Sequence, residues 1–198
     1  MENEDSRHNK FGVDWDAEAD RAAAVAFPYT SGGFFEYFKD RVKPHDKLLD
    51  LGCNIASWIW AWWDIEPTIE YHGFDWSQHA LDIANARYGP GGTHLGSHVP
   101  ATFHQGDMRK MDFNEEFDIV FTHAVYQHTD EETKKLTVPR VHKALKPGGL
   151  HILQENTSYI SNGTWFQQGW IDFFTSFGFK LELVKDFHDG GSGFVFRK

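Results

Sequence analysis

Gly52 and Asp75 have the residue types and the spacing expected of a nucleoside-binding site. Gly52 follows the apolar run 47–51 and precedes a small-residue turn and a helical pattern, and Asp75 ends a second apolar run 23 residues later. A glycine turn lets a ligand approach the backbone, and the amides that begin the next helix favour a carboxylate or phosphate. An acid about 20 residues farther on is the usual partner of ribose hydroxyls, and it would repel a 2'-phosphate. The spacing therefore predicts a ligand with an unphosphorylated ribose.

Each of these two features also has an ordinary structural explanation. Glycine turns are weak signals and are common in proteins that bind no nucleotide. Asp75 could instead cap the N-terminus of the next helix, although Ser77 is also available for that position.

The remaining sequence alternates short apolar runs with helical patterns. Strands are expected at 47–51, 71–75, 101–105, 117–122 and 149–154, and helices at 16–27, 34–42, 56–64, 77–87, 130–145 and 165–177. This alternation predicts a parallel sheet with helices on both faces. The last two runs, 180–186 and 192–197, have only a short glycine-containing turn between them and therefore predict an antiparallel hairpin.

Four tryptophans lie together in the segment after the glycine turn. At helical spacing Trp58 and Trp62 share one face, which we expect to pack on the sheet. Trp60 and Trp63 point elsewhere, and we expect them to contact the N-terminal helices.

Length, charge and cysteine content narrow the classes of protein. The chain has 198 residues and suits one domain, in which residues 1–46 form an acidic tail and N-terminal helices and residues 47–198 form a single globular unit. A net charge of -10 with scattered basic residues argues against a nucleic-acid partner. The single cysteine, the polar N-terminus and the lack of a long apolar run favour a cytoplasmic protein without a membrane span.

Five stretches in order resemble the class I S-adenosylmethionine-dependent methyltransferases, over about residues 47–198. The stretch 49–53 is similar to the first motif of the family, 74–75 to its ribose-binding acid, 105–108 to its third-strand motif, 117–120 to its fourth strand and 140–149 to the turn before its fifth. The resemblance implies an α/β, Rossmann-like fold with a seven-stranded sheet of order 3-2-1-4-5-7-6, strand 7 antiparallel. The predicted hairpin fits this order. The resemblance further implies that the N-terminal helices within residues 1–46 form a lid over the cofactor.

The resemblance also implies the cofactor and the residues that hold it. The cofactor is expected to be S-adenosyl-L-methionine, and no metal is expected. The cofactor-binding residues that it implies are Asp50, Gly52, Asn54, Ala56, Asp75, Trp76, Asp107, Met108 and His123. Asn54 and Ala56 stand where the family usually has glycine, but Asn tolerates a left-handed backbone and Ala has a small side chain, so we expect the turn to form.

Two alternatives use the same residues. A nicotinamide-dependent oxidoreductase would need further glycines at Asn54 and Ser57, and both are missing. A degenerate methyltransferase domain that senses the cofactor or binds a partner protein is suggested by Asn54 and Ala56.

Methyl transfer to a hydroxyl or ammonium requires a base, and histidine suits this role near neutral pH. His123 and His128 follow the expected fourth strand. The resemblance places the position of His128 toward the acceptor, so we expect His128 to be the catalytic base. The alternative is that His128 only packs or forms local hydrogen bonds.

The acceptor is expected to be a small molecule, methylated on oxygen or nitrogen, because the chain has no long insertion with which to hold a macromolecule. Aromatic side chains suit an apolar or cationic acceptor. The expected substrate-binding residues are Tyr29, Tyr126, Tyr159 and Trp165. His94, His98 and His104 lie in a glycine-rich stretch that we expect to be a solvated loop rather than a metal site.

Overall fold

The structure is a computed structural model that describes residues 13–24, 33–157, 166–187 and 190–198. Contacts divide the chain into an N-terminal unit, residues 14–108, and a C-terminal unit, residues 109–198 together with 1–13. The expected organisation into residues 1–46 and 47–198 stays a prediction.

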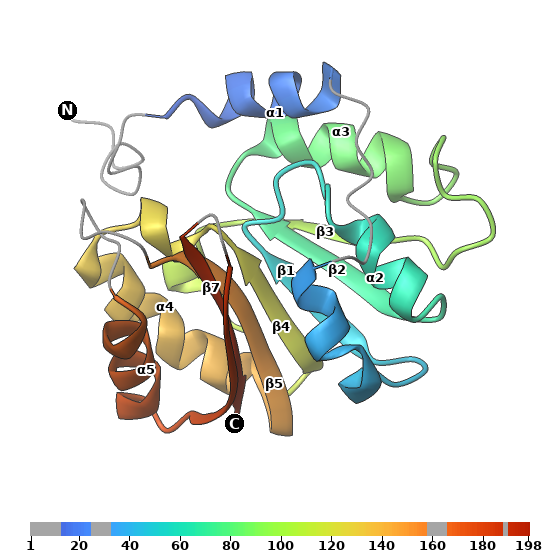
Figure 1. Ribbon diagram of the computed structural model, residues 1–198. Helices are drawn as coiled ribbons and strands as arrows, with labels where there is room; N and C mark the ends of the chain where they lie inside the picture. The colour runs from blue at the N-terminus through green and yellow to red at the C-terminus, as the bar shows by residue number, and fades with distance from the viewer. Residues whose placement is uncertain (1–12, 25–32, 158–165, 188–189) are drawn as a thin grey trace. The chain divides into compact units, whose positions relative to one another are not determined.

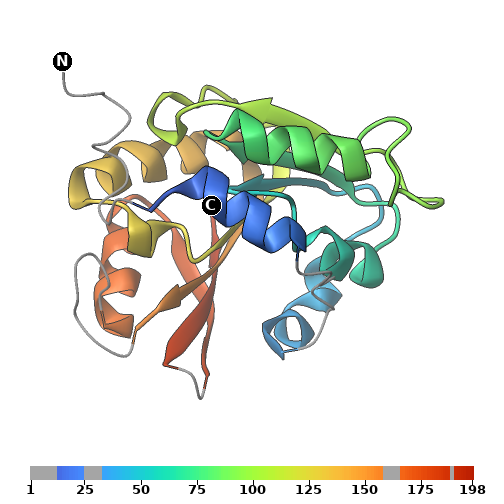
Figure 2. The same cartoon turned by 90° about the horizontal axis from the view of Figure 1, so that it is seen from above.

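The N-terminal unit contains three parallel strands. β1 is Lys47–Leu51, β2 is Glu70–Asp75 and β3 is Thr102–Gln105; β2 pairs with both of the others. The helices are α1 (Trp15–Ala24), α2 (Ile59–Ile65) and α3 (Gln78–Tyr88), with 3-10 turns η2 (Gly33–Tyr37) and η3 (Lys39–Arg41). α3 packs on β2 and β3, and α1 lies beside α3 in both views (Figure 1, Figure 2).

The C-terminal unit contains the other four strands. β4 is Phe117–His123, β5 is Leu145–Asn156, β6 is Lys180–Asp186 and β7 is Gly191–Arg197. Its α-helices are α4 (Glu131–Ala144) and α5 (Gln167–Ser176), its 3-10 turn is η5 (Tyr126–His128), and the 3-10 turn η4 (Met108–Lys110) lies at the unit boundary. β4 and β5 are parallel, whereas β7 is antiparallel to both β5 and β6.

The strand order of the sheet is β3-β2-β1-β4-β5-β7-β6. This order, the parallel strands and the antiparallel β6–β7 hairpin confirm the predicted Rossmann-like fold. Among the residues that the structure describes, no helix has both the length and the apolar character needed to cross a membrane.

Two predicted helices differ from the structure. The segment 34–42 forms the two 3-10 turns η2 and η3 instead of one helix. The helix expected from residue 56 begins at Ile59, because Ala56 has a φ of 57°, which lies in the left-handed region.

The later start of α2 also changes the predicted tryptophan contacts. Trp58 precedes the helix, and its ring stacks on Phe35 with 5.5 Å between centroids, while Trp62 packs edge-on against the same Phe35. Trp63 instead stacks on His98 at 4.3 Å. In the described part of the N-terminal segment, the ring contacts of Phe35 are thus with Trp58 and Trp62, whereas such contacts were expected from Trp60 and Trp63.

The core of the C-terminal unit contains a buried histidine. His151 on β5 is fully buried against the rings of Tyr126, Phe174 and Phe179. Neither ring nitrogen has a hydrogen-bond partner within the described part of the chain. Burial without compensation lowers the pKa of His151 from 6.5 to about 3, so the neutral ring is the form that the core accepts.

Acid should therefore destabilise the protein through His151. Below pH 6.5 the unfolded chain binds a proton at this position that the folded chain does not, down to about pH 3. The free energy of unfolding should lose about 1.4 kcal/mol per pH unit from this residue over that range. The measurement is urea unfolding at several pH values for the parent and for His151→Phe, in which this contribution is absent. His94→Phe, at an exposed position, should keep the pH dependence of the parent. Identical pH dependence in all three proteins would contradict the assignment.

Candidate functional site

The three strands of the N-terminal unit end together at one edge. Leu51 pairs with Phe74, and Asp75 pairs with Gln105. The backbone N–H of Gly52 donates to the carbonyl of Phe74 at 2.7 Å, and that of Gly106 donates to the carbonyl of Asp75 at 2.9 Å. The residues that follow β1, β2 and β3 are therefore neighbours, at the edge where open α/β sheets bind ligands.

The turn after β1 has an alternating backbone conformation. Gly52, Asn54 and Ala56 have φ angles of 77°, 50° and 57°. A left-handed backbone costs a residue with a Cβ about 1–2 kcal/mol, although Asn adopts it more readily. The Asn54 side-chain oxygen accepts the N–H of Ile55 at 2.7 Å and so closes the turn locally. Asn54 and Ala56, which stand where the family usually has glycine, thus both adopt the left-handed backbone, and the turn forms as expected.

Asp75 is held by the backbone on both sides. One carboxylate oxygen accepts the N–H of Asn54 at 2.8 Å, and the other accepts the N–H of Ser77 at 3.0 Å. Burial raises the pKa of Asp75, while these amides and that of Trp76 act in the opposite direction. Each carboxylate oxygen has a second lone pair, so the group can still accept the hydroxyls of a diol.

Ser77, not Asp75, caps the helix that follows β2. Its hydroxyl oxygen accepts the N–H of Ala80 at 3.0 Å. This removes the alternative explanation of Asp75 as a helix cap.

Asp50 is almost fully buried. Its side chain is 2% exposed and accepts a hydrogen bond from the Tyr71 hydroxyl. Burial, partly offset by that hydroxyl, raises the pKa of Asp50 to about 7. The carboxyl group therefore lies beneath the strand ends rather than at the surface.

The remaining predicted cofactor residues of this unit lie at the same edge. Trp76 directly follows Asp75 and is 38% exposed, and its carbonyl accepts a hydrogen bond from the Gln105 side chain at 2.9 Å. Asp107 and Met108 follow β3 and are half-buried. An exposed aromatic ring and a flexible thioether at a strand end are suited to contact a nucleobase.

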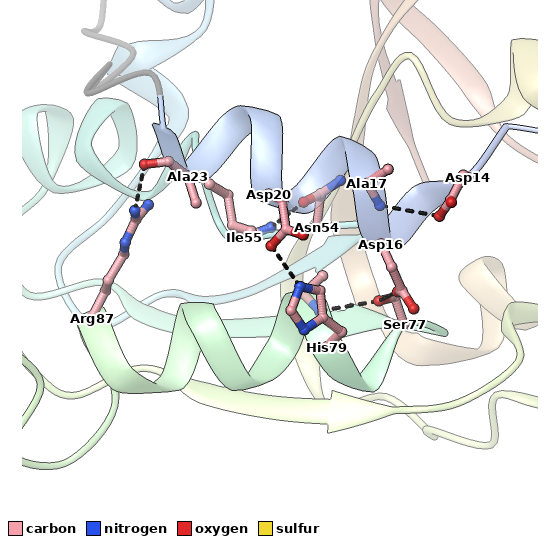
Figure 3. A network of polar contacts seen from close by, with 11 residues as sticks. Asp14, Asp16, Ala17, Asp20, Ala23, Asn54, Ile55, Ser77, His79 and Arg87 are labelled. Atoms are coloured by element: carbon pink, nitrogen blue, oxygen red, sulfur yellow. Dashed lines mark hydrogen bonds and ion pairs between the residues drawn. The ribbon is translucent and has the colours of Figure 1, made fainter.

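Helix α1 packs over the turn. Ala19 of α1, Ile55 of the turn and Ala80 of α3 form a buried cluster. The Ser77 hydroxyl donates to Asp16 at 2.6 Å, the His79 ring lies 2.8 Å from Asp20, and the carbonyl of Ala23 accepts from Arg87 at 3.0 Å (Figure 3). Sequence reasoning expected N-terminal helices near the cofactor but gave no signal for these individual contacts.

The predicted residues of the C-terminal unit follow β4. His123 ends the strand and is half-buried, and Ala124 has a φ of 55°. Tyr126 is fully buried against Trp170 and Phe174. Its ring therefore belongs to the core rather than to a surface open to an acceptor.

His128 is half-buried at the end of η5, and its Nε2 faces an amide. The Gln127 side-chain oxygen accepts the N–H of Asn156 at 2.9 Å, which directs the Gln127 nitrogen toward Nε2 of His128 at 3.2 Å. An amide nitrogen only donates, so Nε2 is the acceptor of this pair and the ring is neutral there. A neutral imidazole is the form that can take up a proton.

A hollow of about 350 Å³ lies in the C-terminal unit beside the end of β5. It combines aromatic rings with amide and carboxylate groups, and its lining includes Thr157, Phe166, Gln167, Asp186 and Phe187. Phe166 is 56% exposed. The predicted substrate residues Tyr29, Tyr159 and Trp165 lie outside the described residues.

Sequence reasoning missed Glu155. This residue on β5 is 1% exposed, and its carboxylate accepts hydrogen bonds from the backbone of the segment that carries His128. An acid near the end of an apolar strand was the available signal, and it is the same pattern that marked Asp50.

The three histidines that could have suggested a metal site have separate surroundings. His98 stacks on Trp63, His94 lies 2.8 Å from the Thr93 hydroxyl, and His104 lies 3.2 Å from His72. Within the part of the chain that the structure describes, no three His, Cys, Asp or Glu side chains form a cluster that could hold a metal ion.

Solved structures share this fold. A Bordetella parapertussis protein described as a possible exported protein has a TM-score of 0.70 and 19% identity over 85% of this chain, which spans 66% of that protein's length. An S-adenosylmethionine-dependent methyltransferase from Mesorhizobium loti has a TM-score of 0.64 and 16% identity, covering 83% of this chain and 97% of its own. A methyltransferase of the same description from Aquifex aeolicus has a TM-score of 0.72 and 9% identity, covering 92% and 97%.

The sequence itself identifies the family. No curated protein matches it significantly. Residues 48–149, which contain the turn, Asp75 and the segment after β4, match the profile of the family described as a methyltransferase domain. With this match over more than half of its length, the chain belongs to that family of methyltransferases.

Proposed function

We propose that this methyltransferase transfers the methyl group of S-adenosylmethionine to an oxygen or nitrogen atom of a small-molecule acceptor. The observation that carries the proposal is the Asp75 carboxylate, which the amides of Asn54 and Ser77 hold at the strand ends with lone pairs left for a diol. When bound, the sulfonium cofactor supplies an electrophilic methyl group.

The residues at the edge of β1, β2 and β3 would hold the donor. Asp75 would accept the ribose hydroxyls, Trp76 and Met108 would contact the adenine ring, and Asp107 would accept its amino group. The backbone of residues 52–56 would approach the methionine part of the cofactor. The Asp50 carboxyl group would lie beneath this part of the site. Orientation of the donor is the main contribution that a protein makes to such a displacement.

The C-terminal unit would supply the acceptor side. Its hollow of about 350 Å³ is at the lower end of the range of about 300–1,000 Å³ that is typical of small-molecule pockets. His128 would remove the proton of a hydroxyl or ammonium acceptor. Uptake of this proton at Nε2 requires that the acceptor replace the Gln127 amide.

We also propose that the protein acts in the cytoplasm. Cys53 is the single cysteine of the sequence and is buried, so the fold uses no internal disulfide and suits a reducing compartment.

Neutralising Asp75 should weaken donor binding. In Asp75→Asn one acceptor oxygen becomes a donor and the charge is lost, so the affinity for S-adenosylhomocysteine should fall about 10- to 100-fold, as expected for hydrogen bonds to a charged group. Calorimetric titration measures the affinity, and circular dichroism checks folding.

Asp82→Asn, at an exposed position of α3, is the matched control and should bind like the parent. A titration of the parent with NADH separates the oxidoreductase alternative, because we expect no binding. Equal affinity of Asp75→Asn and the parent for S-adenosylhomocysteine would refute the assignment of the ribose site.

Removal of the His128 ring should lower turnover without affecting donor binding. We expect kcat of His128→Ala to fall about 100-fold or more, the usual contribution of general base catalysis. The assay measures S-adenosylhomocysteine release with the best acceptor from a panel of phenols, amines and carboxylic acids.

His94→Ala controls for the loss of an exposed imidazole and should retain full activity. If His128→Ala retains the kcat of the parent at saturating acceptor, His128 has no role as a base. If no acceptor in the panel is methylated although S-adenosylhomocysteine binds, the cofactor-sensing alternative is favoured.

A further inference from the structure

The Glu155 carboxylate binds three consecutive backbone amides. One oxygen accepts the N–H groups of Val125 at 3.2 Å and Tyr126 at 3.1 Å, and the other accepts that of Gln127 at 3.0 Å. These amides lie at the start of η5, where the first N–H groups of a helix lack partners within the helix. A side chain from another strand therefore supplies the acceptors that the local sequence does not.

The neighbours of Glu155 on β5 bind the same segment. The carbonyl of Gln154 accepts the N–H of Ala124 at 2.9 Å, and the N–H of Asn156 donates to the Gln127 side chain at 2.9 Å. Residues 154–156 thus hold residues 124–127, and we call this set of contacts the β5 clamp. Gln154 and Asn156 each make one hydrogen bond to this segment, whereas Glu155 makes three.

The far end of the segment is also anchored. Lys134 of α4 is 1% exposed, and its ammonium group donates to the carbonyl of Thr129 at 2.5 Å. The Thr129 hydroxyl donates to the carbonyl of Tyr126 at 2.9 Å. His128 lies between the clamp and this second anchor, so its backbone position depends on both.

The charge of Glu155 determines whether the clamp is complete. A carboxylate accepts at both oxygens, whereas a protonated carboxyl group has one oxygen that carries a proton to donate and is a weaker acceptor. Burial raises the pKa of Glu155 to about 7, and the three amides and Lys134 of α4 oppose this rise. Tyr126 faces it from η5, and Ser192 is its pairing partner on β7.

We propose that Glu155 is a positioning residue for methyl transfer: its carboxylate fixes residues 125–127 and thereby sets the position of His128. This inference rests on the proposed function, in which His128 acts on the acceptor. Glu155 acts through the backbone and does not itself take part in the reaction.

Hydrogen exchange of the amides of residues 125–127 tests the clamp without an acceptor. In the parent, their protection factors should fall about tenfold between pH 8 and pH 6, as Glu155 takes up its proton. In Glu155→Gln, one acceptor oxygen becomes an NH2 group, so protection should be low at both pH values. Glu131→Gln, exposed at the start of α4, is the control and should behave like the parent.

Kinetics test the positioning role. Glu155→Gln should lower kcat about tenfold, while the affinity for S-adenosylhomocysteine stays within about threefold of the parent. Equal protection of residues 125–127 in the parent and in folded Glu155→Gln at pH 8 would overturn the proposal. If that variant does not fold, Glu155→Asp takes its place, because the shorter side chain cannot reach all three amides. Loss of protection with unchanged kcat would also overturn it, because Glu155 would then only stabilise the fold. Failure of the parent to bind S-adenosylhomocysteine would refute the proposed function and leave the exchange result as a separate test of the clamp.

Discussion

The Asp75 carboxylate connects the parts of the N-terminal unit that form the proposed donor site. Its two oxygens bind the amides of Asn54, in the left-handed turn, and Ser77, at the start of α3. Ser77 in turn binds Asp16 of α1. Because the carboxylate is buried, these amides are what favour its charged form. The bonds that favour the charged form of Asp75 also fix the direction of its carboxylate, so the proposed donor site depends on the same interactions as the local fold.

Buried acids recur at or near the carboxyl ends of the strands. Asp50, Asp75 and Glu155 lie on β1, β2 and β5, and burial raises the pKa of each. A buried carboxylate is costly unless it is hydrogen-bonded, and the turns that follow parallel strands supply unpaired N–H groups. Asp75 and Glu155 use such amides, whereas Asp50 uses the Tyr71 hydroxyl.

Local patterns were enough to predict most of the fold and half of the candidate site. Alternating apolar runs and helical patterns depend on neighbours in the sequence, and they predicted the parallel strands and the β6–β7 hairpin. The spacing between Gly52 and Asp75 identified two strand ends that the register brings together. The segment 34–42 was predicted less well, since aromatic side chains at helical spacing do not distinguish one helix from two 3-10 turns.

The sequence by itself thus determined the order of strands and helices, the glycine turn and the acid expected to bind ribose, because each follows from residue type and short-range spacing. Only the tertiary structure decided that Tyr126 belongs to the core, that Ala56 adopts a left-handed backbone and that Glu155 holds the segment before His128. The burial of Tyr126 and the bonds of Glu155 depend on residues 20 or more positions away. The amides of residues 125–127 find their acceptor on β5 only after the two strands have paired.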